Sequence, residues 1–370
     1  MAWPTVTIKI EDLMNGPLPT IDNRFLFVGY GTVTGENRPL YLVDSTTKLD
    51  EVLDKAAPEY LAVCEAAQLN AKQNWTAGVL ILDQGDNWQD AVKKANEVAS
   101  FEGMVINNDA TDKTMLEDAI ALRHELKNVL GRETFVMMAV PKINNDPSAG
   151  QTWDEYVAAC VAIVTDIASE YITVVPNVHE ELDTLGKYAG RLANGEVSIA
   201  DSPARVKSGS VLGRSAFMTD KAGNTLQLSQ LKALEASRFS CPMDYPDYPG
   251  QYWTTGNTLS VPGSDYHDVR HIRVAMKAAR FVRVRGIARI GDRTFNSTPA
   301  STEAAKSFFS QDLRRMALTG TPGEIYPPDE DSISIKWVTS EEVEIYMSVQ
   351  PYECPVKITI AISLKQGEYA

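Results

Sequence analysis

The sequence has few cysteines, and none of them forms a close pair. Four cysteines occur among 370 residues, and no Cys-x-x-Cys motif is present. A small disulfide scaffold and a zinc ribbon both depend on such pairs, so both classes are excluded. A chain of this length buries a core without cross-links, and we expect buried free thiols at Cys64, Cys160, Cys241 and Cys354.

The sequence also lacks a long apolar run and an excess of positive charge. The most apolar window, residues 157–167, is interrupted by Thr165 and Asp166 and is much shorter than the roughly 20 residues of a membrane span. Pro4 and Lys9 lie where a signal peptide would have its apolar core, so we expect a soluble cytoplasmic product without a membrane anchor. The formal charge of −14 disfavours nonspecific binding of the whole chain to nucleic acid.

Short apolar runs alternate with amphipathic stretches along the first half of the chain. We predict buried strands at 25–28, 40–43, 79–82, 103–106, 135–140 and 171–175. We predict helices between them at 48–72, 88–99, 114–130, 153–168 and 182–192. Such alternation indicates an α/β layer with a mostly parallel sheet.

The second half of the chain has a different composition. Residues 195–265 are rich in Gly, Ser, Pro, Asp and Tyr, and the prolines of 241–249 predict an irregular segment, because proline fixes φ and excludes helix. Helices are predicted at 266–283 and 298–318. Strands are predicted at 333–337 and 343–349, where they form a β-hairpin.

These patterns predict an α/β fold, α+β when the chain is taken as a whole, with extended strand arms at both termini. We expect an N-terminal arm at residues 1–20 and an α/β domain at 21–240. A smaller C-terminal domain with two helices and a β-hairpin is expected at 241–350, followed by a C-terminal arm at 351–370.

No set of residues forms a convincing catalytic or cofactor site. Gly29 to Gly35 follows a strand, as a dinucleotide-binding loop does, but the third glycine comes one residue late and the next residues block a helix. His267 and His271 have the spacing of zinc ligands on a helix, with Asp268 in place of the usual Glu, but no third ligand is evident. We therefore expect no enzyme activity, no cofactor and no metal. A metal-dependent hydrolase is kept as an alternative.

The strongest local signal is a concentration of positive charge. Residues 266–293 carry eight basic and two acidic residues, whereas 322–370 carry three basic and nine acidic. Four cations at spacings of three, four and three share one face of the predicted helix. Unless this face is only solvated, we expect it to contact another copy of the chain, an acidic protein or nucleic acid. These cations are Arg270, Arg273, Lys277 and Arg280.

Both termini have the pattern of isolated alternating strands set apart by prolines. An isolated strand leaves its backbone groups unpaired and must join a sheet. Each arm either completes a sheet of its own chain or pairs with the hairpin of a neighbouring subunit. The residues expected in strand exchange are Val6, Ile8, Ile10, Ile333, Ile335, Val343, Ile345, Met347, Ile358, Ile360 and Ile362.

Several segments together resemble contractile tail sheath proteins, which form the outer sleeve of contractile phage tails and tailocins. They include 27–43 with its glycine turn, 60–80, the junction at 200–204, and 250–272. In the last of these, Gly250 to Leu259 precedes Tyr266-His-Asp-Val-Arg-His271, where the family commonly has a second Arg in place of His271. The resemblance covers most of the chain and is weakest over residues 100–195.

The resemblance implies a structural subunit of the compact two-domain type. Residues 21–240 would be its outer domain and 241–350 its inner domain. Such subunits polymerise helically around a tail tube and contract by rearrangement, which drives the tube through the host envelope. The implied partners are further copies of the chain, the tail tube protein, and the baseplate and tail terminator proteins. The implied location is the virion tail, after assembly in the host cytoplasm. The four cations of the predicted helix 266–283 would contact the tube or a neighbouring subunit, and a nucleic-acid-binding phage protein remains an alternative.

Overall fold

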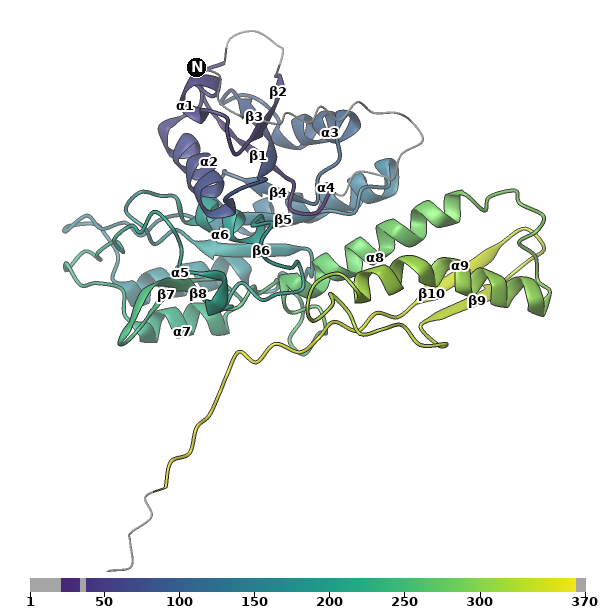
Figure 1. The fold of residues 1–370 in the computed structure, drawn as a ribbon. Helices are drawn as coiled ribbons and strands as arrows, with labels where there is room; N and C mark the ends of the chain where they lie inside the picture. Colours follow the sequence, from purple (N-terminus) through teal and green to yellow (C-terminus); the bar gives the residue numbers. More distant parts are fainter. Residues whose placement is uncertain (1–20, 34–37, 364–370) are drawn as a thin grey trace, which may run out of the picture.

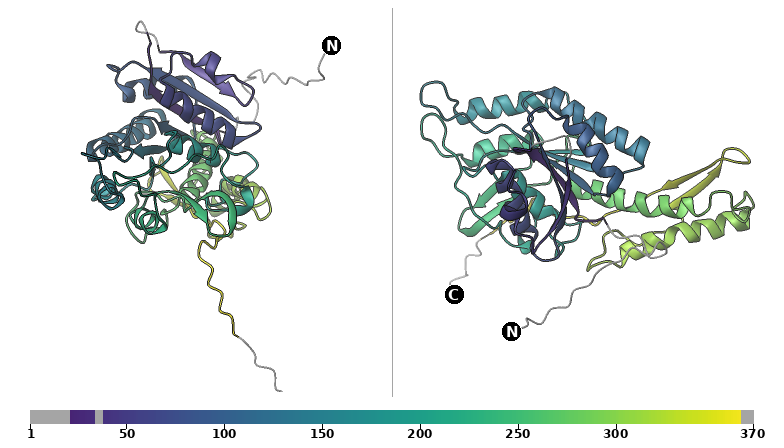
Figure 2. Two further views of the ribbon diagram at one scale, coloured as in Figure 1. Left: turned by 90° about the vertical axis from the view of Figure 1, so that its left-hand side faces the viewer. Right: turned by 90° about the horizontal axis from the view of Figure 1, so that it is seen from above.

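The computed structural model describes residues 21–33 and 38–363, so the strand predicted within residues 1–20 lies outside the described residues. The chain forms an α/β body, residues 21–33 and 38–260, and a C-terminal rod, residues 269–347. The rod projects from one side of the body (Figures 1 and 2). None of the helices in the described ranges is long and apolar enough to cross a membrane.

A six-stranded sheet forms the centre of the body. Its strands are β1 (Phe25–Tyr30), β2 (Leu40–Asp44), β3 (Thr76–Leu82), β4 (Gly103–Ile106), β5 (Phe135–Val140) and β6 (Ile172–Pro176). They lie in the order β2-β3-β1-β4-β5-β6, and every neighbouring pair is parallel except β2–β3. The predicted mostly parallel sheet is confirmed, with an antiparallel strand at one edge.

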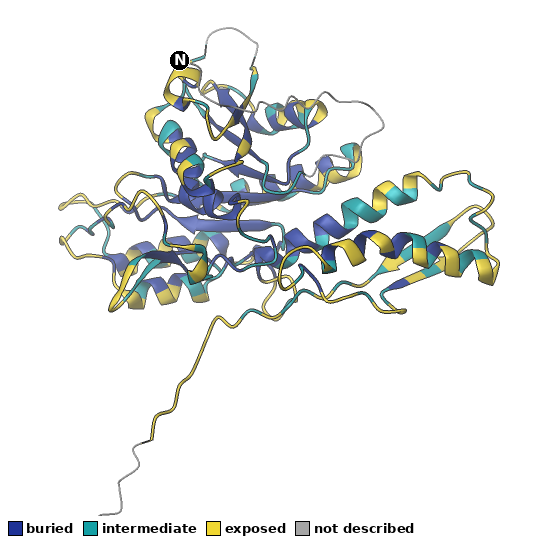
Figure 3. Ribbon diagram, in the orientation of Figure 1, coloured by how far each residue is buried: buried dark blue, intermediate teal, exposed yellow. Residues whose placement is uncertain are grey.

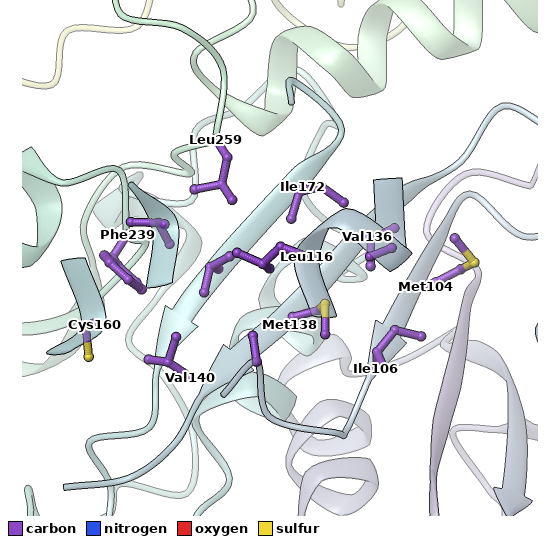
Figure 4. Close-up of a cluster of buried hydrophobic side chains, with 14 of the residues drawn as sticks. Met104, Ile106, Leu116, Val136, Met138, Val140, Cys160, Ile172, Phe239 and Leu259 are labelled. Atoms are coloured by element: carbon purple, nitrogen blue, oxygen red, sulfur yellow. The ribbon is translucent and has the colours of Figure 1, made fainter. Parts of the chain in front are cut away.

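Helices cover both faces of the sheet, which explains why its strands are apolar on both sides. The core on one face includes side chains of α3 (Trp88–Val98), α4 (Lys113–Leu130), α5 (Trp153–Val164) and α7 (Leu228–Ala236), and Figure 4 shows part of it. The core on the other face includes side chains of α1 (Leu49–Val52), α2 (Pro58–Ala71) and α6 (Thr184–Leu192). Successive residues of β1 point into opposite cores, Leu26 into the first and Phe27 into the second.

The segment 241–249, predicted to be irregular, forms most of a β-hairpin. β7 (Pro242–Tyr245) pairs antiparallel with β8 (Tyr248–Trp253). The prediction is wrong because proline excludes helix but is tolerated at the first residue of a strand and on an edge strand. Trp253 at the end of β8 is fully buried and stacks on Tyr188 with 5.1 Å between ring centroids, which attaches the hairpin to the body.

The rod consists of two helices and a β-hairpin, as predicted. Its elements are α8 (Val269–Ile287), α9 (Pro299–Ala317), β9 (Ile333–Trp337) and β10 (Val343–Met347). α8 begins later than predicted because the Asp268 side chain caps it and accepts a hydrogen bond from the amide of Arg270.

α8 contributes to two cores at once. Its first turns place Ile272 and Met276 in the core between the sheet and α2, α6 and α1. On another face it places Val274 and Ala278 in the core of the rod, with Phe309 and Leu313 of α9. The same helix therefore joins the body to the rod.

After β10 the chain first runs back along the molecule, and its last described part then extends away from it (Figures 1 and 3). Residues 351–363 form no strand, and Ile358, Ile360 and Ile362 are 74, 78 and 87% exposed. Within the described ranges, this segment pairs with no strand of its own chain. The structure therefore does not show residues 351–363 completing a sheet of the same chain, which was one of the two predicted arrangements.

Candidate assembly surfaces

The β9–β10 hairpin is a two-stranded sheet with an apolar and a polar face. Ile335 lies opposite Ile345, and Ile333 lies opposite Met347. These four side chains pack in the core of the rod, and Val343 is half-buried. Ser334, Lys336 and Tyr346 are exposed. No third strand joins this sheet within the described residues, so both strands keep an edge at which another strand can be added.

The predicted strand-exchange residues therefore fall into three groups. The five in the hairpin lie together on one small sheet. Ile358, Ile360 and Ile362 lie on the exposed C-terminal segment, where every second residue is a large apolar side chain. Val6, Ile8 and Ile10 lie outside the described residues. Strand exchange itself stays a prediction.

The four cations of α8, called the α8 seam below, lie inside the molecule rather than on its surface. They are Arg270, Arg273, Lys277 and Arg280. Arg270, Arg273 and Lys277 are 7, 3 and 8% exposed, and Arg280 is half-buried. Arg273 forms a two-armed ion pair with Glu102, with Nε–Oε1 and Nη2–Oε2 distances of 2.7 and 2.9 Å, and donates to the carbonyl of Leu192 at 2.9 Å. The sequence does not predict these partners, because Glu102 is 171 residues away along the chain.

The rest of the seam contacts acidic groups on either side of α8. Lys277 Nζ lies 2.7 Å from both Asp22 Oδ2 and Glu324 Oε1, and Arg280 Nη2 donates to Asp22 Oδ1 at 2.7 Å. Burial would raise the pKa of Asp22, but Lys277 and Arg280 outweigh burial and lower it. Burial dominates for Glu324 and raises its pKa. These pairs give each of these cations a carboxylate partner within one chain, although Arg280 Nη1 and Glu324 Oε2 are buried without a hydrogen bond. Its contact with a tube or a neighbour stays a prediction.

The two histidines with zinc-ligand spacing face each other but also contact the backbone. Their rings meet edge to face with 5.4 Å between centroids. The Nδ1 atoms of His267 and His271 lie 3.1 and 2.7 Å from the carbonyl oxygens of Ser264 and Asp265. Asp268 caps α8 and pairs with Arg270, so it does not face a metal position between the rings. In the described part of the chain, no group of three or more His, Cys, Asp or Glu side chains is placed to hold a metal ion.

The glycine-rich turn after β1 serves close packing. Gly31 lies against the segment before α2, where a Cβ atom would come within 2.0 Å of the carbonyl oxygen of Lys55. Residues 34–37 lie outside the described residues. At Gly31 the turn thus differs from a dinucleotide-binding turn, in which the glycines admit a pyrophosphate at the start of a helix.

One carboxylate at the end of the parallel strands is held in an unfavourable environment. Asp109 follows β4, and its Oδ1 accepts a long 3.5 Å hydrogen bond from Asn177, which follows β6. Burial raises the pKa of Asp109 to about 6. The folded state therefore binds a proton there more tightly than the unfolded state does, and stability is lost as the pH rises from about 4 to about 6.

Asp109→Asn should raise stability at neutral pH. The amide keeps the acceptor for Asn177 and removes the cost of the buried charge, so we expect a gain of about 1–2 kcal/mol at pH 7 and almost none at pH 4. Urea unfolding of both proteins at the two pH values measures the difference. Equal stabilities at pH 7 would show that Asp109 ionises without cost.

Two family models match adjacent parts of the chain. One, described as "DUF2586, N-terminal domain", matches residues 3–257. The other, described as "DUF2586, C-terminal domain", matches residues 265–367. Together they span nearly the whole sequence.

A curated relative is similar over almost the full length. It is named "Putative tail sheath protein" and comes from Haemophilus phage HP1 (strain HP1c1). It is 41% identical over 372 residues, which cover 98% of each chain.

Two solved structures share the fold at 12% sequence identity. The helical sheath of the anti-feeding prophage in its contracted state matches with a TM-score of 0.63 and covers 99% of this chain and 100% of its own. The sheath tail protein from Desulfitobacterium hafniense matches with a TM-score of 0.55, over 94% of this chain and 96% of its own. At this identity the likeness concerns the fold alone. With the two family models and the full-length relative, it confirms the resemblance seen in the sequence: the chain belongs to the DUF2586 family of phage tail sheath proteins.

Proposed function

We propose that this sheath protein is the subunit of a contractile tail, that it polymerises helically around a tail tube, and that it contracts by rearrangement of subunits to drive the tube through a host envelope. The observation that carries the proposal is the presence, on one chain, of an exposed segment with the alternating apolar pattern of a strand and an open two-stranded sheet. Within the described residues, the segment has no strand to pair with and the sheet has no third strand.

The chemistry of the two surfaces supports their pairing between copies. A strand added to an open edge satisfies the free N–H and C=O groups of both partners. The period of two places Ile358, Ile360 and Ile362 on one side, where they would continue the apolar face of β9 and β10. Because contraction would exchange one set of interfaces for another, the subunit requires neither an active site nor a cofactor.

The remaining assignments follow from this role. We propose that residues 1–20 and 351–370 are exchanged arms, with Val6, Ile8 and Ile10 in the N-terminal strand, and that 21–240 and 241–350 are the outer and inner domains. The proposed partners are further copies of the chain, the tail tube protein, and the baseplate and terminator proteins. The proposed location is the virion tail, after assembly in the host cytoplasm. We keep contact of the α8 seam with the tube or a neighbour as a proposal, and Arg280 is its most accessible member.

The test replaces Ile358, Ile360 and Ile362 together by Asp. Burying one such side chain contributes about 1.5–3 kcal/mol, so losing three should raise the critical concentration for tube formation at least about 100-fold. Negative-stain images over a concentration series measure it, and circular dichroism shows that the chain stays folded.

A matched control replaces Lys357, Thr359 and Ser363, whose side chains point to the other side of an extended segment, by Ala. We expect the control to form tubes as the wild type does. Normal tubes from the triple Asp variant would exclude strand exchange by this arm. A wild-type chain that forms neither tubes nor rings would exclude the sheath assembly proposed here.

A further inference from the structure

We propose that the α8 seam positions the described residues to which the two terminal arms are attached, and that one helix therefore holds both arm roots. The N-terminal root is residues 21–24, directly before β1, and the C-terminal root is residues 350–354. The inference rests on the proposed exchange of arms between subunits. It gives the seam a role as a set of positioning residues inside the chain.

The N-terminal root is held by three members of the seam. Asp22 accepts from Lys277 and Arg280, each at 2.7 Å. Asn23 Oδ1 accepts from Arg273 at 2.7 Å, and its backbone N–H donates to Glu102 Oε2 at 2.6 Å. The side chains of Asp22 and Asn23 and the backbone N–H of Asn23 are thus held by charge-assisted hydrogen bonds. Such bonds are about twice as strong as neutral ones.

The C-terminal root is held by the first member of the seam. Arg270 Nη1 donates to the carbonyl of Tyr352 at 2.8 Å and to Cys354 Sγ at 3.4 Å. Tyr326 contacts the same root in two ways. The centroids of the Tyr326 and Tyr352 rings are 3.9 Å apart, and the amide of Tyr326 donates to the carbonyl of Gln350 at 2.8 Å. Past Cys354 the chain becomes exposed.

The charges of this arrangement match within one chain. Arg273, Lys277 and Arg280 face three carboxylates, which are Asp22, Glu102 and Glu324. Arg270 is paired with Asp268. The carboxylates and the two roots therefore bind each of the four cations from within the chain, as a positioning role requires.

The two roots are held at neighbouring stretches of the same helix. Arg270 holds the C-terminal root, and the contacts to the N-terminal root follow it by three to ten residues, or ~4.5–15 Å along a helix at 1.5 Å per residue. The arms therefore start at fixed points along one rigid element that also belongs to both cores. An arm whose root is already ordered loses less conformational freedom when it binds a neighbour.

The experiment uses Asp22→Ala for the N-terminal root and Arg270→Ala for the C-terminal root, with Arg270→Lys in case the alanine variant does not fold. Lys can still pair with Asp268 but has no fork with which to reach Tyr352 at the same time. The matched control is Arg285→Ala, at a position of the same helix α8 that contacts neither root. This substitution removes an ion pair with Asp312 of α9.

Two readouts on the unassembled chain test the anchoring. Hydrogen exchange at the amides of Asn23 and Arg24 should rise about tenfold in Asp22→Ala, because releasing one ordered residue corresponds to roughly that factor. Cleavage by chymotrypsin after Tyr352 should rise about tenfold in the Arg270 variants for the same reason. Each variant should affect its own root, and Arg285→Ala should affect neither. Roots that respond no more than in the control would overturn the proposal.

The critical concentration for tube formation tests positioning itself. We expect a rise of about tenfold in Asp22→Ala and in the Arg270 variants and none in Arg285→Ala. Released roots with unchanged assembly would overturn the positioning role. If the wild type forms no tubes, the proposed function fails, and the exchange and cleavage data still decide whether the seam anchors the roots.

Discussion

Arg273→Ala should lower the free energy of unfolding by about 3–5 kcal/mol, because it leaves a buried charge without a partner. Glu102 is fully buried, and both of its oxygens accept from Arg273. The substitution also removes donors to the carbonyl of Leu192 and to Asn23, so buried acceptors in the body and at the N-terminal root lose their bonds together.

Urea unfolding at pH 7 followed by circular dichroism measures this loss. The control is Lys48→Ala, which removes an ion pair with Glu51 in which both side chains are more than 60% exposed. Such pairs contribute little, and we expect less than about 0.5 kcal/mol. A similar, small loss in both variants would show that Glu102 gains solvent or another partner when Arg273 is removed.

Trp253→Ala should cost about 3–5 kcal/mol, the range for deletion of a large buried aromatic side chain. The ring is fully buried, stacks on Tyr188 and belongs to the same core as Ile272 and Met276 of α8. Its loss leaves a cavity where the β7–β8 hairpin, the sheet and α8 meet.

The expected result can be separated from a general effect of the hairpin. Tyr248→Ala changes an aromatic residue of the same strand that is 53% exposed, and it should cost less than about 1 kcal/mol. Trp253→Phe should lose much less than Trp253→Ala, because Phe retains a ring against Tyr188. Equal losses in Trp253→Ala and Tyr248→Ala would mean that the site collapses without a cavity.

The parts of the fold that local patterns specify could be predicted. The apolar runs of β3 and β5 indicate a sheet buried on both faces, and the alternation in β9 and β10 indicates a hairpin with one polar face. The β7–β8 hairpin was missed, because proline excludes helix and leaves the choice between a strand edge and a loop open.

The partners of the seam could not be predicted, because no local pattern connects them. The helical spacing showed that four cations share a face, but a cation on a surface and a cation paired inside the chain have the same spacing. Glu102 lies 171 residues before Arg273, and Asp22 lies 258 residues before Arg280. Only the packing of the body against α8 brings these charges together.

Because α8 contributes side chains to two cores, the unfolding of one core is linked to that of the other. Ile272 and Met276 belong to the core of the body, while Val274 and Ala278 belong to that of the rod, so neither core can open without exposing apolar surface of the same helix. The two cores are thereby coupled, and the subunit should melt in a single cooperative transition. If force acts on the proposed arms while the lattice rearranges, the subunit should transmit it as a rigid body, because neither the body nor the rod unfolds before the other.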